Sequence, residues 1–216
     1  MTEITRLEQR DLVDLLRRLN LWSERVADAL ALAGCVHGEQ RRDGGGPYLE
    51  EHVYLVTAEV ACYLSHVDPA AADDAVLAAI LHDTIEDSSI VREEAIAARF
   101  GESVATAVAT LSKSTKRGGR SGVATADGEE RYVANIDGSA LPIRVIKVFD
   151  RLNNLAALQQ RPVRKRRQYL AESRAFYLEL ARSVDESLAH QMTQLLETQE
   201  AALNDRAATH GASPKD

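Results

Sequence analysis

A chain of 216 residues, 45% of them hydrophobic and 27% charged, has the composition of a folded globular protein with room for one well-buried core. Its formal net charge of -7 excludes non-specific coating of nucleic acid, because binding along a phosphate backbone requires a surplus of Lys and Arg. Charged side chains interrupt the first residues, and no apolar stretch approaches the length of a membrane-spanning helix. We therefore expect a cytoplasmic protein without a signal peptide, a membrane anchor or general nucleic-acid binding.

Apolar residues recur at helical spacing along almost the whole chain, and sustained alternation of apolar and polar residues is absent. This pattern predicts an all-α protein. Clusters of Gly, Pro and Asp divide the chain into about nine helices, which we assign to a single domain over residues 1–205 with a disordered tail over 206–216. Cys35 and Cys62 fall in apolar helical patterns without a CxxC pair, so we expect both to be reduced core residues.

A glycine-rich turn at residues 44–47 separates two groups of candidate site residues. It is not a P-loop, since neither Gly-Lys-Ser nor Gly-Lys-Thr follows it. Arg41 and Arg42 precede the turn, where arginines either face a phosphate or a base or remain solvated. After the turn, residues 48–52 (YLEEH) supply His52 as a candidate metal ligand.

An apolar run over residues 75–81 (AVLAAIL) ends abruptly in His82, Asp83, Glu86 and Asp87. In one continuous helix these four side chains would project at roughly 0°, 100°, 40° and 140°, and so would share one face. Three carboxylates at the end of a buried helix repel one another unless a cation compensates their charge. The segment therefore predicts a divalent metal site that uses His82 and Asp83 as ligands.

Two segments with different patterns follow this run. A Ser-Ser pair followed by a Glu-Glu pair is typical of a helix start, and it predicts a short helix over residues 89–100 that ends at Gly101. Residues 116–128 (KRGGRSGVATADG) lack periodicity and are rich in small residues, which predicts a mobile loop able to cover a site.

The apolar helical segment over residues 145–154 (VIKVFDRLNN) carries one carboxylate, Asp150, in its buried face, and Asn154 lies one turn further along. Two adjacent ligands are too few for a metal, so distant segments must supply the others. We expect a ligand set of His52, His82, Asp83 and Asp150. The alternative for Asp150 is a structural ion pair with Arg151 at a helix end.

The remaining histidines and a basic run are interpreted as lying outside the site. We expect His37 to contact a loop, His66 to be solvated, and His190 and His210 to lie in a tail helix and in the disordered end. The basic run over residues 161–167 (RPVRKRR) opens a helix, and we expect it to form a solvated face, with contact to an anionic ligand as the alternative.

Three motifs in this order resemble the HD superfamily and, within it, the hydrolase domain of the RelA/SpoT enzymes and the stand-alone small alarmone hydrolases. They read HGEQRRDGGGPYLEEH at 37–52, ILHDTIED at 80–87 and IKVFDRLNN at 146–154. The family shows a His-to-Arg segment leading to Pro-Tyr and a His, then HDxxED, then DRLxN. The resemblance covers residues 25–180.

The resemblance implies an HD-domain helical bundle that removes pyrophosphate from the 3′ position of guanosine tetra- or pentaphosphate. It implies a divalent metal, usually Mn²⁺, held by His52, His82, Asp83 and Asp150. It further implies that Glu86 and Asp87 orient or deprotonate the attacking water. The nucleotide contacts that it implies are Arg42, Tyr48, Arg151 and Asn154.

Two positions depart from the family pattern. One residue more than is common separates Tyr48 from His52, and in an α-helix such an insertion turns a side chain by about 100°. Asp43 and three glycines stand where the family favours Lys-Ser-Gly-Glu, which replaces a cation by an anion beside the expected pocket. The competing hypotheses are an HD phosphatase acting on ordinary nucleotides and a non-catalytic HD binding module.

Overall fold

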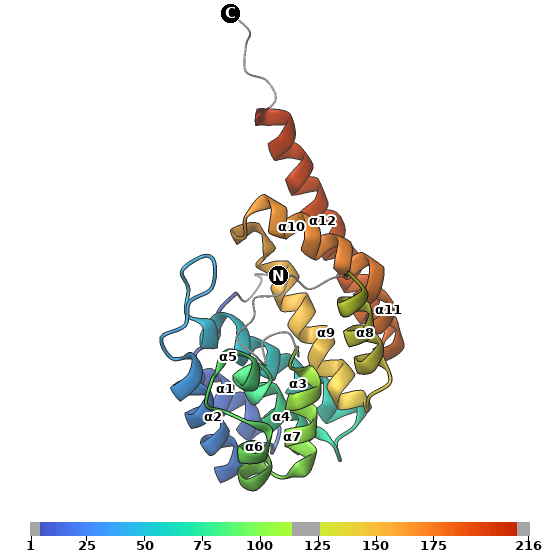
Figure 1. Ribbon diagram of the computed structural model, residues 1–216. Helices are drawn as coiled ribbons and strands as arrows, with labels where there is room; N and C mark the ends of the chain where they lie inside the picture. Colours follow the sequence, from blue (N-terminus) through green and yellow to red (C-terminus); the bar gives the residue numbers. More distant parts are fainter. Residues whose placement is uncertain (1–4, 114–125, 211–216) are drawn as a thin grey trace, which may run out of the picture.

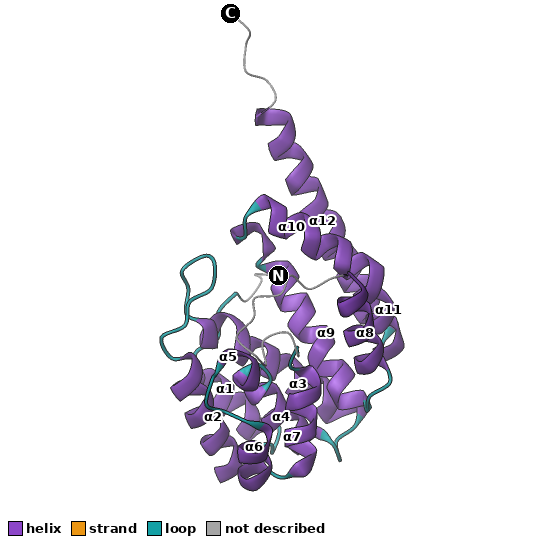
Figure 2. Cartoon of the chain, in the orientation of Figure 1, coloured by secondary structure: helices purple, strands orange, loops and turns teal. Residues whose placement is uncertain are grey.

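The computed structural model describes residues 5–113 and 126–210, and within these ranges the chain forms helices and no strand (Figures 1 and 2). The predicted all-α class is confirmed. The α-helices are α1 Gln9–Arg18, α2 Glu24–His37, α3 Tyr54–Val67, α4 Ala72–Leu81, α5 Thr84–Asp87, α6 Glu93–Phe100, α7 Glu102–Leu111, α8 Ala126–Asp137, α9 Leu141–Ala156, α10 Val163–Glu172, α11 Leu178–Val184 and α12 Glu186–His210. Two π-helical turns, η1 Leu49–Val53 and η4 Ser173–Tyr177, and a 3-10 turn, η3 Leu158–Gln160, complete them.

Helix α4 lies at the centre of the N-terminal half of the fold. It packs against α2, α3, α7 and α9, and every residue from Ala75 to Leu81 is buried. A helix that is apolar on all sides is stable only where other helices cover it completely. This arrangement explains the apolar run in the sequence and holds His82, the first polar residue after α4, inside the protein.

Helix α9 connects the two halves of the fold. It contacts α3 and α4 on one side and α11 and α12 on the other, and its buried residues include Val145, Phe149 and Leu152. The buried apolar residues form one continuous cluster that extends from Leu12 to Leu203. Such a core is what the predicted single domain requires.

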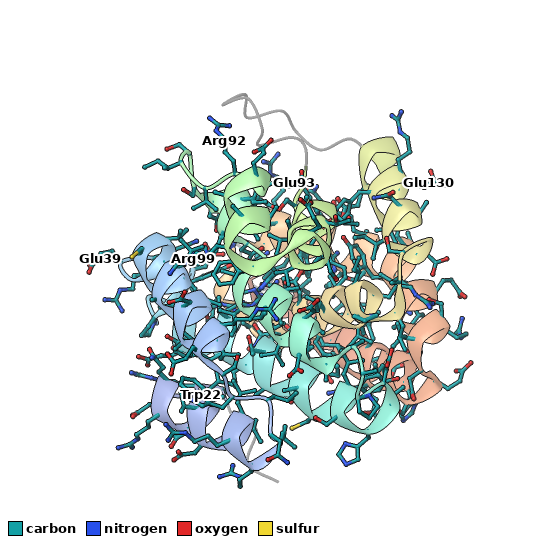
Figure 3. All side chains as sticks on the ribbon, turned by 90° about the horizontal axis from the view of Figure 1, so that it is seen from below. Trp22, Glu39, Arg92, Glu93, Arg99 and Glu130 are labelled. Atoms are coloured by element: carbon teal, nitrogen blue, oxygen red, sulfur yellow. The ribbon has the colours of Figure 1, made fainter. Side chains whose placement is uncertain are left out.

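Many charged side chains lie at the surface, away from this core. Figure 3, viewed from below, shows Arg92 and Glu130 pointing outward from the helices. Cys35 and Cys62 are unpaired but exposed, so the prediction that they are core residues is wrong: each lies on the solvent side of its amphipathic helix. Among the described residues, no helix combines the length and the apolar character needed to cross a bilayer.

Several predicted boundaries also change. The described residues form α1 to α12 rather than about nine helices, because short turns such as α5 leave little periodicity in the sequence. Helix α6 begins at Glu93, since the Ser88 hydroxyl accepts backbone N–H bonds from Ile90 and Val91 and so closes a turn instead. Gly101 ends α6 with φ +93°, as expected for a residue without a Cβ.

Two predicted irregular segments are partly helical. Residues 126–128 of the expected loop belong to α8, and residues 206–210 of the expected tail belong to α12, whose C-terminal part points away from the rest of the protein in Figure 1. Residues 116–125 and 211–216, on which the rest of these two predictions fall, lie outside the described residues.

Candidate active site

His82 and Asp83 follow α4 directly, in a turn that precedes the short helix α5. The continuous helix expected through residues 82–87 is therefore wrong: α4 ends at Leu81, and Asp83 has a ψ of -3°. The Thr84 hydroxyl donates a hydrogen bond of 2.7 Å to the Leu81 carbonyl oxygen, which offers the backbone an alternative to the helical ladder. The break does not remove His82 and Asp83 from the interior, because α4 remains buried up to its last residue.

His52 lies in η1, the π-helical turn that leads into α3. A π-helical turn contains one residue more than an α-helical turn, so it accommodates the additional residue between Tyr48 and His52 before α3 begins. The side chain of His52 is 1% exposed, and its imidazole lies against that of His82. The rotation by about 100° that an insertion into an α-helix would cause does not turn His52 away.

Polar atoms from three separate segments converge at this point. The Nε2 atom of His52 lies 3.2 Å from His82 Nε2, 3.4 Å from Asp83 Oδ2 and 3.5 Å from Asp150 Oδ1. His82 Nε2 lies 3.0 Å from Asp83 Oδ2. One candidate ligand atom from each of His52, His82 and Asp83 falls within 4.8 Å of the other two, and Asp150 adds its oxygen from α9 on the His52 side.

The hydrogen-bond partner of each Nδ1 atom indicates which ring nitrogen carries a proton. His52 Nδ1 lies 2.7 Å from Asn153 Oδ1, and His82 Nδ1 lies 2.8 Å from the Ala79 carbonyl oxygen. Both partners are acceptors, so both Nδ1 atoms donate, and the Nε2 atom of either ring has a free lone pair whenever that ring is neutral. Two imidazole nitrogens and nearby carboxylate oxygens are a donor set that suits Mn, Fe or Zn. The residues present therefore fit a divalent cation.

The negative charge of the site favours a positive charge among these groups. Burial lowers the pKa of His82, but the carboxylates of Asp83 and Asp150 outweigh burial and raise that pKa to about 9. Burial also raises the pKa of Asp83, but the positive charge of protonated His82, whose Nε2 lies 3.0 Å from Asp83 Oδ2, holds that pKa well below its usual range. A proton on His82 balances the carboxylates, and a divalent cation that displaces this proton would do the same.

Asp150 is held by two neighbours on its own helix. Lys147 Nζ donates to Asp150 Oδ2 over 2.7 Å, and Asn154 Nδ2 donates to Oδ1 over 2.6 Å. Burial raises the pKa of Asp150, but the positive charge of Lys147 outweighs it and lowers the pKa to about 2. The ion pair of Asp150 is thus with Lys147, whereas Arg151 lies 3.5 Å from Glu172.

Glu86 and Asp87, the predicted catalytic carboxylates, are held by hydrogen bonds from two other segments. Glu86 Oε2 accepts a bond of 3.1 Å from the backbone N–H of Lys113, the last described residue before the gap at 114–125. Asp87 Oδ2 accepts a bond of 3.0 Å from Gln40 Nε2, and Gln40 Oε1 lies 2.6 Å from His37 Nδ1. The expected contact of His37 with a loop is thus a contact with Gln40.

Asp83, Glu86, Asp87 and Asp150 line a cavity of about 270 Å³. Its wall contains five carboxylates and six basic side chains: Asp43, Asp83, Glu86, Asp87, Asp150, Arg41, Arg42, Lys113, Lys147, Arg151 and Arg161. A cavity that places the carboxylates of Asp83 and Asp150 beside many basic groups is suited to a small, strongly anionic ligand that also contacts a metal. Arg161 belongs to the basic run, so the expected solvated face is only partly correct, and Arg166 in the same run is 1% exposed.

Arg42 lies in the cavity wall, but protein groups engage its guanidinium. Arg42 Nη1 donates to the Glu51 carbonyl oxygen over 3.0 Å and to Asn153 Oδ1 over 2.6 Å, and Nη2 donates to Asn154 Oδ1 over 2.9 Å. A bridge between Arg41 and Pro47 closes the glycine-rich turn that precedes η1. Gly45 adopts φ +87° in this turn, which favours glycine over any other residue.

Tyr48 and Arg151 also line the cavity, and the structure gives each of them a protein partner. The Tyr48 hydroxyl donates to Asp83 Oδ2, and burial together with Asp83 raises the pKa of that hydroxyl well above its usual range. The Arg151 guanidinium lies between the rings of Tyr169 and Tyr177, at 3.4 and 3.9 Å from their centroids. Arg151 Nε donates to the Ser173 hydroxyl over 2.8 Å. Their contacts with a nucleotide remain predictions.

Sequence reasoning missed Asn153, Lys147 and Gln40. Lys147 stands three residues before Asp150, so helical spacing could have identified it as a partner. Asn153 occupies the unspecified position of the DRLxN motif, and its partner His52 lies 101 residues earlier in the sequence. Gln40 reaches Asp87 across 47 residues. No local pattern indicates such distant pairings.

Comparisons with known proteins agree with this geometry. A family model described as the HD domain matches residues 29–185. A guanosine-3′,5′-bis(diphosphate) 3′-pyrophosphohydrolase of Aquifex aeolicus is 34% identical over 177 residues, which cover 80% of this chain and 23% of that protein. A probable GTP diphosphokinase of Arabidopsis thaliana is 33% identical over 178 residues, which cover 78% of this chain and 24% of that protein. The chain spans about a quarter of the length of these curated relatives.

A solved structure, described as a metazoan ortholog of SpoT that hydrolyses ppGpp, has the same fold. It aligns with a TM-score of 0.62 at 21% identity, covering 82% of this chain and 97% of that one. The family model covers most of the chain, and its range includes the segments that bring His52, His82, Asp83 and Asp150 together. The chain therefore belongs to the HD-domain family.

Proposed function

We propose that this protein is a metal-dependent phosphohydrolase that removes pyrophosphate from the 3′ position of a guanosine 3′,5′-bis(diphosphate)-type alarmone. The observation that carries the proposal is the convergence of two imidazole Nε2 atoms, 3.2 Å apart, with carboxylate oxygens of Asp83 and Asp150, which also line a cavity rich in basic side chains. The relative from Aquifex aeolicus, which is named for this activity, matches the region that contains these residues. A cytoplasmic location fits a nucleotide substrate and two unpaired, exposed cysteines.

In this proposal, His52, His82, Asp83 and Asp150 hold a divalent cation, which we assign as Mn²⁺. When bound, such a cation supplies Lewis acidity, which lowers the pKa of water and polarises a phosphoryl oxygen. The two Nδ1 hydrogen bonds keep both imidazoles oriented for it. The hydrogen bonds from Lys147 and Asn154 keep the Asp150 carboxylate ionised and fixed.

The remaining polar residues bind the substrate and move the proton. Water adds to the phosphorus bonded to the ribose 3′ oxygen, and the bond between that phosphorus and the 3′ oxygen breaks. Pyrophosphate leaves, and the 3′ oxygen takes up a proton from solvent to become a hydroxyl. Glu86 accepts the proton of the water as general base, and Asp87 positions Glu86 or the leaving group. The basic side chains of the cavity bind the phosphates, and Arg42, Tyr48, Arg151 and Asn154 form the wall against which the nucleotide lies.

One observation favours a second candidate, an HD phosphatase that acts on ordinary nucleotides. Asp43 lines the cavity where the family favours Lys, and its Oδ2 lies 3.3 Å from Arg161 Nε. This ion pair reduces the positive charge available to a ligand with two diphosphate groups. A nucleoside monophosphate would tolerate that reduction better than the alarmone.

A panel of nucleotides assayed with several divalent metals tests these candidates. The panel contains guanosine tetraphosphate, guanosine pentaphosphate and plain nucleoside mono-, di- and triphosphates, and the products are separated by ion-exchange chromatography. We expect GDP and pyrophosphate from guanosine tetraphosphate with Mn²⁺. Orthophosphate from a nucleoside monophosphate, without any turnover of the alarmone, would establish the second candidate. No turnover of any nucleotide, combined with no stoichiometric metal in the purified protein, would establish a non-catalytic binding module.

A further inference from the structure

Asn153 links the wall of the cavity to the first residue of the metal site. It contacts Arg42, Glu51 and His52, although the DRLxN motif leaves its position unspecified. We propose that Asn153 is a positioning residue that fixes the tautomer of His52, with Arg42 as the anchor that orients Asn153. The inference rests on the proposed metal site, but it does not depend on the identity of the nucleotide.

Two independent contacts fix the orientation of the Asn153 amide. Arg42 Nη1 lies 2.6 Å from Asn153 Oδ1, and a guanidinium has donors only, so the atom facing it must be the oxygen. Asn153 Nδ2 lies 3.3 Å from the Glu51 carbonyl oxygen, which accepts only, so the atom facing that group must be the nitrogen. In the opposite orientation the amide nitrogen would face the Arg42 donor, and the amide oxygen would face the Glu51 carbonyl oxygen, so neither pair could form a hydrogen bond.

This orientation determines which nitrogen of His52 carries the proton. Asn153 Oδ1 lies 2.7 Å from His52 Nδ1, so Nδ1 must donate, and in the neutral ring the lone pair then resides on Nε2. His52 is 1% exposed, so bulk solvent does not replace a lost hydrogen bond there. Without Asn153, the neutral ring can carry its proton on Nε2, and in that tautomer the nitrogen facing His82 and Asp83 cannot bind a cation.

Arg42 contacts two elements that carry proposed ligands, η1 and α9. Its Nη1 also donates to the carbonyl oxygen of Glu51 in η1, over 3.0 Å, and its Nη2 donates to Asn154, which in turn donates to Asp150. Arg42 therefore connects the π-helical turn that carries His52 to the helix that carries Asp150. A buried guanidinium with three such bonds is suited to positioning other groups.

Two substitutions of Asn153 distinguish the loss of its acceptor oxygen from a change of side chain that keeps such an oxygen. Asn153→Leu removes both acceptor contacts, Asn153→Asp retains an oxygen that accepts from Arg42 and His52, and Asn204→Leu on the exposed side of α12 is the matched control. Affinity for Mn²⁺ alone is measured by calorimetric titration, with circular dichroism as a check of folding. We expect Asn153→Leu to weaken binding about 10- to 100-fold. We expect Asn153→Asp and the control to bind within a few fold of the natural protein.

A direct readout of the tautomer does not require any variant. Long-range proton–nitrogen spectra of the natural protein, labelled with ¹⁵N-histidine and loaded with diamagnetic Zn²⁺, report which nitrogen of His52 carries the proton. We expect Nδ1–H with Nε2 bound to the metal. Any of three results would overturn the proposal: coordination through Nδ1, unchanged affinity in a folded Asn153→Leu, or equal losses in Asn153→Leu and Asn153→Asp. If Asn153→Leu does not fold, the spectra and Asn153→Asp decide.

A failure of this inference about Asn153 can be distinguished from a failure of the proposed function. A protein that binds Mn²⁺ with the expected dependence on Asn153, but does not hydrolyse guanosine tetraphosphate, would support this inference and contradict the substrate. Hydrolysis of the alarmone by a protein in which Nδ1 of His52 binds the metal would support the proposed substrate and contradict this inference.

Discussion

Glu86 lines the cavity together with Asp83 and Asp150, and its carboxylate is held by the backbone of Lys113. If Glu86 is the general base, Glu86→Gln removes the proton acceptor while it preserves size and most of the hydrogen bonding. We expect kcat for alarmone hydrolysis to fall about 10²- to 10⁴-fold. Affinity for Mn²⁺ should remain unchanged, because Glu86 is not among the proposed ligands.

Glu94 provides the matched control for this variant, because it is an exposed glutamate in the first turn of α6. Glu94→Gln should hydrolyse the alarmone at the natural rate. An unchanged kcat in Glu86→Gln would remove Glu86 from the proposed chemistry, and a loss of metal affinity would identify it as a ligand instead.

His82 gives the metal-free protein a characteristic dependence on pH. Its pKa of about 9 in the folded protein lies above the ordinary value of 6.5. A raised pKa contributes stability that is fully present below pH 6.5 and is lost as the pH rises through 9. In chelator, we expect the free energy of unfolding to fall between pH 6.5 and 9 by up to about 3 kcal/mol more in the natural protein than in His82→Gln.

Urea unfolding at the two pH values measures this difference. The same proton competes with a cation, so affinity for Mn²⁺ should rise with pH across this window. Equal pH dependence of stability in the natural protein and in His82→Gln would show that His82 is not protonated in the folded, metal-free state.

At the scale of elements, η1 offers a test of how the chain accommodates its additional residue. Deleting Glu50 should convert the π-helical turn into an α-helical one, while His52 keeps its place relative to α3. We expect affinity for Mn²⁺ to stay within about tenfold of the natural value. Stability should fall slightly, because Glu50 forms an ion pair with Arg6 and its carbonyl oxygen accepts from the Leu7 N–H.

Deletion of Glu59 is the matched control, because this exposed residue lies inside α3. That deletion rotates the helix beyond it by about 100° and so misplaces its buried side chains. We expect the control to lose its cooperative unfolding transition. Loss of metal binding in the Glu50 deletion, with the fold retained, would show that the π-helical turn is required for the site.

Elements with strong periodicity were predictable, whereas the breaks between them were not. The burial of residues 75–81 could be inferred because an apolar run without a polar face leaves a helix no solvent side. The turn at His82 and Asp83 could not, because it depends on side-chain hydrogen bonds such as that of Thr84. The π-helical form of η1 shows in the sequence only as a spacing that differs by one residue from the family.

For the whole molecule, the proposed metal site connects three segments that are distant in sequence. His52 precedes α3, His82 and Asp83 follow α4, and Asp150 lies in α9, so a cation bound by all of them stabilises their packing. At about 100 times the dissociation constant, bound Mn²⁺ contributes about 2.7 kcal/mol. We expect it to raise the melting temperature by about 5–10 °C above that in chelator, measured by differential scanning calorimetry.

His52→Gln is the variant that calibrates this shift, because it removes one proposed ligand from the centre of the site. In His52→Gln the difference between metal and chelator should shrink to a small fraction of its natural size. The same shift in both proteins would place the stabilising metal at some other position.

Most of the candidate site was predictable as a set of residues, but not as a network. His82, Asp83 and Asp150 interrupt apolar segments, and buried carboxylates of this kind indicate a compensating cation. The contacts of Asn153 with Arg42 and His52 cross more than 100 residues, so they depend on the packing of α9 against η1. The engagement of Arg42 by three protein groups has the same origin.

If this protein is a 3′-pyrophosphohydrolase, it should convert guanosine tetraphosphate into GDP and intact pyrophosphate. Phosphorus NMR of guanosine tetraphosphate, incubated with the protein and Mn²⁺, measures both products in one spectrum as they form. We expect equimolar GDP and pyrophosphate from the natural protein and neither product from His82→Gln. Release of orthophosphate, or loss of the 5′ rather than the 3′ diphosphate, would contradict this activity.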